Sequence, residues 1–304
     1  MNTKKYVISV VGTTAIGKTA LGIKLAQHFD AEIISADSRQ FFKEMTIGTA
    51  VPSKEELTAA KHHFIQNISI FDAYSVGDFE KDALQKITEL HKKTDVVILL
   101  GGSGLYLDAV LKGLDYFPKI DKQIRIDLKK SLEENGLAQL QNQLKKLDLK
   151  SYNTIAIDNP QRLIRALEIC IGSGKPYASF LNKNKGKRAF IPIKIGLTAD
   201  REIIYNRINQ RVDVMVKNGL IDEAKKLYKH KELNALQTVG YRELFQYFDG
   251  DFTLDFAISE IKKNTRRFAK RQTTWFKRDV DINWFDFQEN IKTITDFIEA
   301  EIVL

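Results

Sequence analysis

Short apolar runs alternate with stretches of helical periodicity along the first hundred residues. The runs at 6–11, 32–35 and 95–100 have the length typical of buried strands. Between these runs, apolar residues recur at helical spacing over 20–29 and 79–91. Strand, helix and strand in this rhythm predict the α/β class, with a parallel sheet and helices on both of its faces.

The rhythm changes after residue 120. Up to residue 187 the pattern gives no convincing strand and predicts helices over 121–135, 137–147 and 161–171. A strand-like run then follows at 190–197, and the later helices are expected over 201–216, 221–230, 241–248 and 254–276. We therefore expect an inserted all-helical domain at 120–189, within a catalytic core formed by 1–119 and 190–304.

Composition narrows the class of protein. The 304 residues are 43% hydrophobic and 28% charged, as in ordinary globular proteins. No apolar run approaches the roughly 18 residues that span a bilayer, and the N-terminus has no signal-peptide pattern. Cys170 is the single cysteine, which excludes a disulfide framework and a Cys-based zinc site. We expect a monomeric cytoplasmic protein with no membrane partner.

Positive charge is concentrated near the C-terminus. The net charge is +8, and the segment 262–278 carries eight basic residues with no acid before Asp279. Such a segment is typical of a surface that binds a polyanion. A solvated basic helix face is the alternative interpretation.

A phosphate-binding loop follows the first predicted strand. It has the pattern G-x-x-x-x-G-K-[ST] and consists of Gly12, Thr13, Thr14, Ala15, Ile16, Gly17, Lys18 and Thr19. The glycines allow backbone N–H groups to turn toward phosphate oxygens, and the following helix adds a positive dipole end. Lys18 supplies a charge and Thr19 can hold Mg²⁺. Because the loop lies between a strand and a helix, a chance glycine turn is the weaker alternative, and the predicted fold is a P-loop-type parallel sheet flanked by helices.

The loop does not identify the phosphate compound. Most such loops bind ATP or GTP, and those enzymes usually carry a second strand ending in an acid that helps to hold Mg²⁺. Here the strand at 96–100 ends in Gly101, Gly102 and Ser103. The absence of an acid argues against an ordinary nucleoside triphosphatase.

Asp37 follows the second predicted strand. Carboxyl ends of parallel strands meet at one edge of a sheet, so Asp37 should lie near the phosphate loop. There it can act as a general base or hold Mg²⁺. Its neighbours Ser38, Arg39 and Gln40 can contact a base or a backbone phosphate. The alternative is a helix N-cap at Asp37 or Ser38.

Eight motifs occur in an order that closely resembles the bacterial tRNA dimethylallyltransferases. They lie at 12–19, 37–40, 47–50, 74–79, 101–106, 159–168, 239–242 and 269–276. The resemblance covers nearly the whole chain. It implies transfer of a dimethylallyl group from dimethylallyl pyrophosphate to N6 of the adenosine 3′ of the anticodon, in tRNAs that read codons beginning with U.

The resemblance also implies roles for particular residues. The phosphate loop would hold the pyrophosphate of the donor, without ATP, and Mg²⁺ would be the metal, with Thr19 and Asp37 as candidate ligands. Asp37 matches the general base that accepts the proton from N6, and Thr14 matches a residue near the bridging oxygen of the donor. Arg211 matches the arginine that binds pyrophosphate, and Arg207 is the other candidate.

The partner implied is the anticodon stem-loop of tRNA. The matching contact positions are Asp37, Ser38, Arg39, Gln40, Ser103, Arg125, Gln161, Arg162, Leu163, Ile164, Arg165, Gln237, Thr238, Val239, Gly240, Tyr241 and Arg242. The chain departs from the family at Thr13 and Ile16, where only the backbone matters, and at Ser103, which keeps the hydroxyl of the usual threonine. His62 and His63 are interpreted as structural.

Helical spacing supports two basic surfaces. Arg162 and Arg165 share one face of the helix predicted at 161–171, although a plain salt-bridged helix is an alternative. In the C-terminal helix a cationic face is formed by Lys263, Arg267, Lys270 and Arg271. The residues expected to point to the core from that helix are Ile261, Phe268, Trp275 and Phe276.

Three other functions compete with tRNA prenylation. A P-loop kinase would use ATP but would give the basic C-terminal helix no role. An enzyme that prenylates free adenine nucleotides would not need the inserted domain. A non-catalytic RNA-binding module would not depend on Asp37 for any turnover.

Overall fold

The chain divides into two compact units. A computed structural model describes residues 4–181 and 186–303. One unit contains Met1–Leu111 and Arg188–Leu304, and the other contains Lys112–Lys187. The sequence placed these divisions at 119/120 and 189/190, so the second unit begins several residues earlier than expected.

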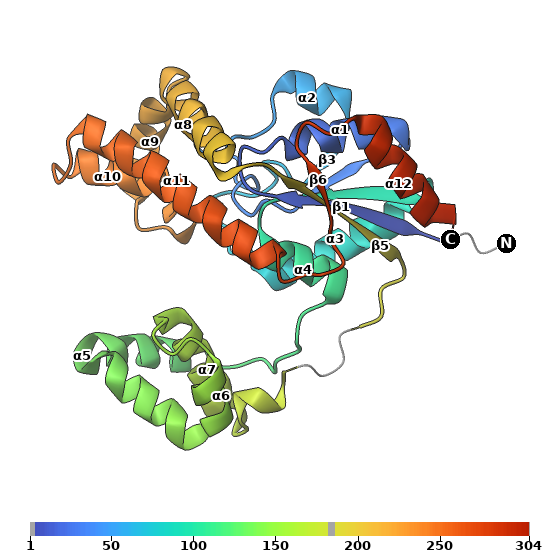
Figure 1. Cartoon of the computed structure of the whole chain (residues 1–304). Coiled ribbons are helices and arrows are strands. Elements are labelled where there is room, and N and C mark those ends of the chain that lie inside the picture. The colour runs from blue at the N-terminus through green and yellow to red at the C-terminus, as the bar shows by residue number, and fades with distance from the viewer. Residues whose placement is uncertain (1–3, 182–185, 304) are drawn as a thin grey trace. The chain divides into compact units, whose positions relative to one another are not determined.

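A six-stranded parallel sheet forms the centre of the first unit (Figure 1). Its strands are β1 (Tyr6–Gly12), β2 (Ile33–Ser35), β3 (His62–His63), β4 (Val96–Leu100), β5 (Ile191–Thr198) and β6 (Asn283–Asp286). Their order is β3-β2-β4-β1-β5-β6, with Val10 of β1 opposite Leu100 of β4 and Ile195 of β5. The expected α/β fold is therefore confirmed.

Helices cover both faces of this sheet. Ile8 and Val10 of β1 face a core shared with α1 (Lys18–His28) and α12 (Ile291–Val303), while Val7 and Val11 face α3 (Val76–Leu90) and α4 (Gly104–Lys112). Every residue of β1 and β4 is buried. Burial on both faces explains why these strands are continuous apolar runs rather than alternating ones. The short helix α2 (Lys54–Ala59) follows β2 in the chain.

A third core in the first unit joins the C-terminal helices to the segment after β2. The helices are α8 (Arg201–Lys217), α9 (Leu220–Leu227), α10 (Tyr241–Phe248) and α11 (Leu254–Phe276), with the 3₁₀ turns Tyr228–His230 and Asn234–Leu236. Phe42 and Met45 pack into this core beside Tyr241 and Leu244. The segment that follows Asp37 is thereby tied to α9 and α10.

The second unit has a core of its own. Its helices are α5 (Lys122–Leu147), α6 (Leu149–Thr154) and α7 (Pro160–Ser173), followed by a 3₁₀ turn at Tyr177–Ser179. Helix α5 is broken at Gly136, whose φ of 77° and ψ of 177° are not helical, at the point where the sequence predicted a stop. Phe117 stacks on Tyr177 with ring centroids 5.2 Å apart. This contact explains why the segment before residue 120 belongs to this unit.

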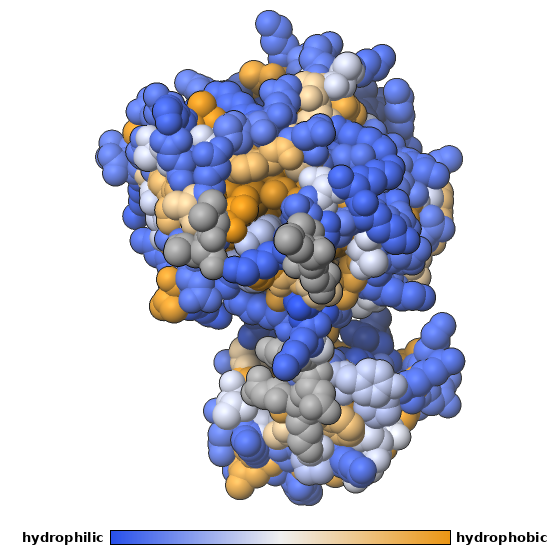
Figure 2. All heavy atoms as spheres, turned by 90° about the vertical axis from the view of Figure 1, so that its right-hand side faces the viewer, coloured by the Kyte–Doolittle hydropathy of each residue, from blue (hydrophilic) through white to orange (hydrophobic). Residues whose placement is uncertain are grey.

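Hydrophilic side chains cover most of the face drawn in Figure 2. Among the described residues, no helix combines the length and the apolar character needed to cross a membrane.

Candidate active site

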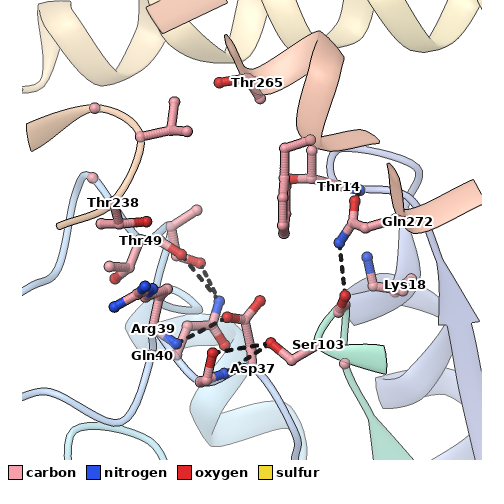
Figure 3. A pocket seen from close by; sticks show the side chains of 18 of the residues that line it. Thr14, Lys18, Asp37, Arg39, Gln40, Thr49, Ser103, Thr238, Thr265 and Gln272 are labelled. Atoms are coloured by element: carbon pink, nitrogen blue, oxygen red, sulfur yellow. Dashed lines mark hydrogen bonds between the residues drawn. The ribbon is translucent and has the colours of Figure 1, made fainter. Parts of the chain in front are cut away.

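A cavity of about 550 Å³ opens at the carboxyl ends of β1, β2 and β4. Thr14, Lys18 and Thr19 of the phosphate loop line it together with Asp37 and Arg211. Figure 3 shows Lys18 and Gln272 on one side and Arg39, Gln40 and Thr49 on the other, with Asp37 and Ser103 between them. The expectation that loop and carboxylate share one pocket therefore agrees with the geometry.

The phosphate loop has the backbone of an anion cradle. Gly12, Ala15 and Gly17 have φ values of 146°, 63° and 112°. A Cβ at Gly12 would lie 2.8 Å from the carbonyl oxygen of Leu197, so the glycine is required by space as well as by backbone conformation. No side chain caps the start of α1 at Gly17. The first N–H groups of α1 are consequently available to an anion.

The remaining loop side chains point away from this cavity. Ile16 lies in the core and Thr13 is 5% exposed, so they contribute through their backbone. Gly12 and Thr13 line a second cavity, of about 420 Å³, beside the first turn of α8 and the last turns of α11. The Nζ of Lys18 donates to the carbonyl of Thr13 at 2.8 Å.

Gln272 of α11 braces the phosphate loop. Its Oε1 accepts from the N–H of Thr14 at 2.8 Å, and its Nε2 donates to the carbonyl of Gly102 at 2.9 Å. A Cβ at Gly102 would lie 2.5 Å from that nitrogen. The side chain is buried. Gln272 belongs to the motif at 269–276, but nothing in the sequence pattern indicates this role.

Asp37 lies in the cavity wall, and no helix begins at Asp37 or Ser38, so the alternative of a helix N-cap is wrong. Its Oδ1 accepts from the N–H of Arg39 at 3.2 Å, a bond that stabilises the turn after β2. The negative charge of Asp37 favours the charged forms of Lys18 and Arg211. The carboxylate and the two cations thus form one electrostatic group.

Burial dominates the ionisation of the two cavity cations. Burial lowers the pKa of Lys18 to about 8, the charge of Asp37 opposes this change, and Arg211 adds to it. Burial also lowers the pKa of Arg211. Desolvated cations attract an anion strongly because the Coulomb interaction is larger where the effective dielectric constant is low.

The two candidate arginines on α8 differ in position. Arg211 lines the cavity. Arg207 donates from Nε to the carbonyl of Ala15 at 2.7 Å, and its guanidinium lies 5.1 Å from the ring centroid of Phe287. Arg207 therefore supports the phosphate loop from outside the cavity.

The wall beside Asp37 is held by hydrogen bonds that join four segments. Ser103 accepts the N–H of Ser38 at 3.1 Å, and the two hydroxyls also lie 3.1 Å apart. Gln40 donates from Nε2 to the carbonyl of Ala50 at 2.8 Å, and Arg39 donates to the carbonyl of Ala235 at 3.0 Å. These bonds join the ends of β2 and β4 to the loop after residue 45 and to the segment before α10.

The segment at 237–242 meets the cavity except at one position. Its lining members are Gln237, Thr238, Val239, Gly240 and Arg242. Tyr241 is fully buried, and its hydroxyl donates to Glu223 Oε1 at 2.7 Å. Its side chain is therefore not available to tRNA, in contrast to the expectation from the resemblance.

The inserted unit presents arginines around a buried carboxylate. Glu168 accepts from Arg165 at 3.0 Å and from Arg125 at 3.4 Å, and both arginine side chains are 40% exposed. Gln161 and Arg162 are exposed. Leu163 and Ile164 are 0% and 2% exposed, so these two expected tRNA contacts belong to the core of the unit. Helical periodicity places them opposite the polar face.

Helix α11 differs from expectation on its inner face. Ile261 and Phe276 are buried as predicted, but Phe268 is 39% exposed and Trp275 lines the cavity. The indole N–H of Trp275 donates to Asp108 Oδ2 at 2.9 Å. Trp275 packs against the core beside Phe276 and also forms cavity wall, whereas Phe268 lies in the cavity wall alone, so its placement in the core was wrong.

Part of the basic surface of α11 is paired. Lys262 lies 2.6 Å from Asp213, and Lys263 forms an ion pair with Glu260. Arg267 and Lys270 are exposed, and Arg271 lines the cavity. The exposed cations of α11 thus continue directly into the cavity wall.

The two histidines occupy different environments. His63 lies 2.6 Å from Glu32 in an ion-pair geometry. His62 lines the cavity, its Nδ1 lies 2.8 Å from the carbonyl of Ala60, and burial lowers its pKa. No cluster of three or more metal-ligating side chains occurs within 4–181 and 186–303.

Comparison with known proteins gives consistent matches. The family model described as IPP transferase matches residues 40–279. A tRNA dimethylallyltransferase of Christiangramia forsetii is 64% identical over 297 residues, which are 98% of each chain. One from Flavobacterium johnsoniae is 63% identical over 97% of each chain.

Solved structures agree with these relatives. A tRNA isopentenylpyrophosphate transferase from Bacillus halodurans is 38% identical and superposes with a TM-score of 0.74 over 98% of this chain and 97% of that one. A eukaryotic dimethylallyltransferase acting on tRNA is 26% identical, with a TM-score of 0.84 over 98% of this chain and 80% of that one. With a family model matched over most of its length and relatives aligned nearly end to end, the chain belongs to the IPP transferase family of tRNA-prenylating enzymes.

Proposed function

We propose that this enzyme transfers a dimethylallyl group from dimethylallyl pyrophosphate to N6 of the adenosine 3′ of the anticodon, in tRNAs reading codons that begin with U. The product is N6-(dimethylallyl)adenosine. The observation that carries the proposal is that the phosphate loop and Asp37 line one cavity of about 550 Å³. That volume lies within the range of about 300–1,000 Å³ usual for ligand pockets.

The donor diphosphate binds at the phosphate loop. The uncapped start of α1 supplies N–H groups. Lys18 of α1 and Arg211 of α8 supply positive charge. Thr14 faces the bridging oxygen of the donor, and Gln272 holds the backbone of Thr14 in place. Negative charge that builds on the leaving diphosphate is stabilised by groups that the fold has already positioned.

Asp37 serves the acceptor. The N6 lone pair attacks the allylic carbon, the bond from that carbon to the bridging oxygen breaks, and diphosphate leaves with the bonding electrons. The carboxylate of Asp37 takes the proton that N6 loses. An exocyclic adenine amine is a weak nucleophile, so alignment between the loop and Asp37 supplies much of the acceleration.

Magnesium fits the residues present. The hydroxyl of Thr19 and the carboxylate of Asp37 both line the cavity and are hard oxygen donors. Mg²⁺ commonly binds through one or two protein oxygens plus substrate phosphates, so a larger acidic cluster is not required. When bound, the ion would neutralise charge on the diphosphate.

The tRNA binds through both units as a complex with a monomeric enzyme. The target base must leave its stack, at a cost of roughly a few kcal/mol. Contacts to the phosphate backbone of the tRNA offset that cost. In the inserted unit they come from Arg125, Arg162 and Arg165. Near the cavity the contacts come from Ser38, Arg39, Gln40, Ser103 and the lining residues of 237–242.

One assay tests the proposal. The enzyme is incubated with Mg²⁺, labelled dimethylallyl pyrophosphate and an unmodified tRNA, and the RNA is digested to nucleosides. We expect label in adenosine at the position 3′ of the anticodon, and none when that adenosine is replaced by guanosine. Label appearing only in free AMP, or ATP hydrolysis without transfer, would contradict the proposal.

A further inference from the structure

One carboxylate on α9 organises the loop that follows the Asp37 segment. The Oε2 of Glu223 accepts from the N–H groups of Thr46 at 3.0 Å and Ile47 at 2.8 Å, and its Oε1 accepts from the N–H of Gly48 at 2.9 Å. Three consecutive backbone donors around one anion form a nest. The same residues of the loop are more than 170 positions away from Glu223 in the chain.

Tyr241 completes this arrangement from α10. Its hydroxyl donates to Glu223 Oε1 at 2.7 Å, and its ring is fully buried against the loop. A Cβ at Gly48 would lie 2.7 Å from ring atoms of Tyr241, so only glycine fits there. The carboxylate thus has four hydrogen-bond donors, which hold the loop against the C-terminal helices.

The loop at 46–50, which Glu223 holds in place, forms part of the cavity wall. Gly48, Thr49 and Ala50 line the cavity wall. The Nε2 of Gln40 donates to the carbonyl of Thr49 at 3.3 Å and to that of Ala50 at 2.8 Å. In Figure 3, Gln40 and Thr49 lie across the cavity from Lys18 and Gln272. Glu223 therefore supports the wall beside Asp37 and makes no hydrogen bond to the phosphate loop.

We propose that Glu223 is a positioning residue for the acceptor base, acting with Tyr241 through the loop at 46–50 to place Gln40. The inference rests on the proposed function and extends it, because it separates the wall that holds the tRNA base from the wall that holds the donor. Glu223 touches neither substrate. Its effect is on the KM for tRNA and on the alignment of the base with Asp37.

The test compares charge-matched variants on one helix. Glu223→Gln keeps the shape but replaces one accepting oxygen with a donor, Glu223→Ala removes all four bonds, and Asp222→Asn alters an exposed neighbour as the control. Loss of hydrogen bonds to a charged group should raise the KM for tRNA about tenfold in Glu223→Ala, and less in Glu223→Gln. The dissociation constant of dimethylallyl pyrophosphate should stay within about twofold of wild type, and Asp222→Asn should leave both constants unchanged.

Hydrogen exchange gives a readout that does not depend on turnover. The amides of 46–48 should exchange faster in Glu223→Gln and Glu223→Ala, with the amides of the phosphate loop unaltered. Should Glu223→Ala fail to fold, Tyr241→Phe supplies the comparison, since it keeps the ring and removes one bond, with an expected rise of about two- to threefold in the KM for tRNA.

Two outcomes would overturn the inference. One is wild-type KM for tRNA in all variants despite faster exchange at 46–48. The other is an equal loss of donor and tRNA binding, which indicates general destabilisation. A wild-type enzyme without transferase activity would instead contradict the proposed function, while the exchange result would still report whether Glu223 holds the loop.

Discussion

The cavity wall of the first unit and the basic surface of the inserted unit are each organised by a carboxylate, but the groups that the two carboxylates hold differ. In each, one carboxylate accepts hydrogen bonds from several donors. Glu223 holds three backbone N–H groups and a tyrosine hydroxyl, whereas Glu168 holds the guanidinium groups of Arg125 and Arg165. Most of the donors to Glu223 are backbone N–H groups. The donors to Glu168 are guanidinium groups at the ends of long side chains that are 40% exposed.

This difference indicates that the cavity serves catalysis, whereas the exposed arginines of the inserted unit serve affinity for tRNA. Groups that the backbone positions in a desolvated cavity interact strongly and keep their geometry, as a reacting centre requires. Exposed guanidinium groups are screened by salt and supply binding that is spread along a phosphate backbone. Substitutions of the reacting groups in the cavity should therefore change rate constants, and substitutions in the inserted unit should change affinity and its dependence on salt.

The largest expected effect is at Asp37. Asp37→Asn keeps the shape of the side chain but cannot accept the N6 proton, so the rate of transfer should fall by about 10²–10⁴-fold. Single-turnover transfer from labelled donor to saturating tRNA measures this rate. Donor binding should persist, and Asp222→Asn should transfer at the wild-type rate. Near-normal transfer by Asp37→Asn would remove the general base from the mechanism.

The next effect is a dependence on pH. Because burial lowers the pKa of Lys18 to about 8, its charge is present below pH 8 and is lost as the pH rises through that value. The kcat/KM for the donor should then fall about tenfold for each pH unit above 8. Lys18→Arg should abolish the fall in this range, because a guanidinium stays charged.

Folding stability should respond to Lys18 with the opposite sign. Between pH 8 and the ordinary pKa of 10.5, the unfolded chain binds more protons at this position than the folded chain. Stability therefore rises with pH over that interval while donor use declines. Urea unfolding at several pH values measures this, and parallel declines of stability and activity would show that the pH effect is not due to Lys18.

A smaller effect is expected in the inserted unit. Arg165→Ala should weaken tRNA binding about tenfold at low salt and reduce the slope of log affinity against log salt by about one. The kcat at saturating tRNA should not change. Lys130→Ala, which removes an exposed charge from the same unit, serves as control. A lower kcat in Arg165→Ala would break the proposed division between the two regions.

The smallest effect is at Ser103. Ser103→Ala removes the oxygen that accepts the Ser38 N–H and contacts the Ser38 hydroxyl. The binding free energy of the transition state should weaken by about 0.5–1.5 kcal/mol, so kcat/KM for tRNA should fall roughly two- to tenfold. Ser103→Thr should restore the wild-type value, because it keeps the hydroxyl. Equal values for the alanine and threonine variants would exclude a role for that hydroxyl.

Prediction from sequence succeeded where burial leaves a long, regular signal. The strands β1, β2, β4 and β5 were visible as apolar runs, and the rule for parallel strand ends brought Asp37 to the phosphate loop. The strand β3 has two residues, and β6 is a half-exposed edge strand of four, so neither produces a readable pattern. Helix α4 was not expected from the sequence, because it begins at Gly104, directly after Gly101 and Gly102.

The supporting residues of the site could not be predicted in this way. Gln272 bonds to an N–H 258 positions away, and Glu223 bonds to amides 175–177 positions away. Periodicity indicates the face on which a polar residue lies but not its partner in space. For Leu163 and Ile164 the signal was present, because helical spacing separates them from Arg162 and Arg165, whereas the resemblance spans 161–165 as a continuous range.

The brace from Gln272 to Thr14 has a consequence for biosynthesis. The glycine-rich turn is translated early, whereas its brace follows 258 residues later. At ~5–20 residues per second, the nascent chain waits about 10–50 s before this bond can form. Until then a growing polypeptide on the ribosome lacks a finished anion cradle, so it should not trap isoprenoid diphosphates before it can use them.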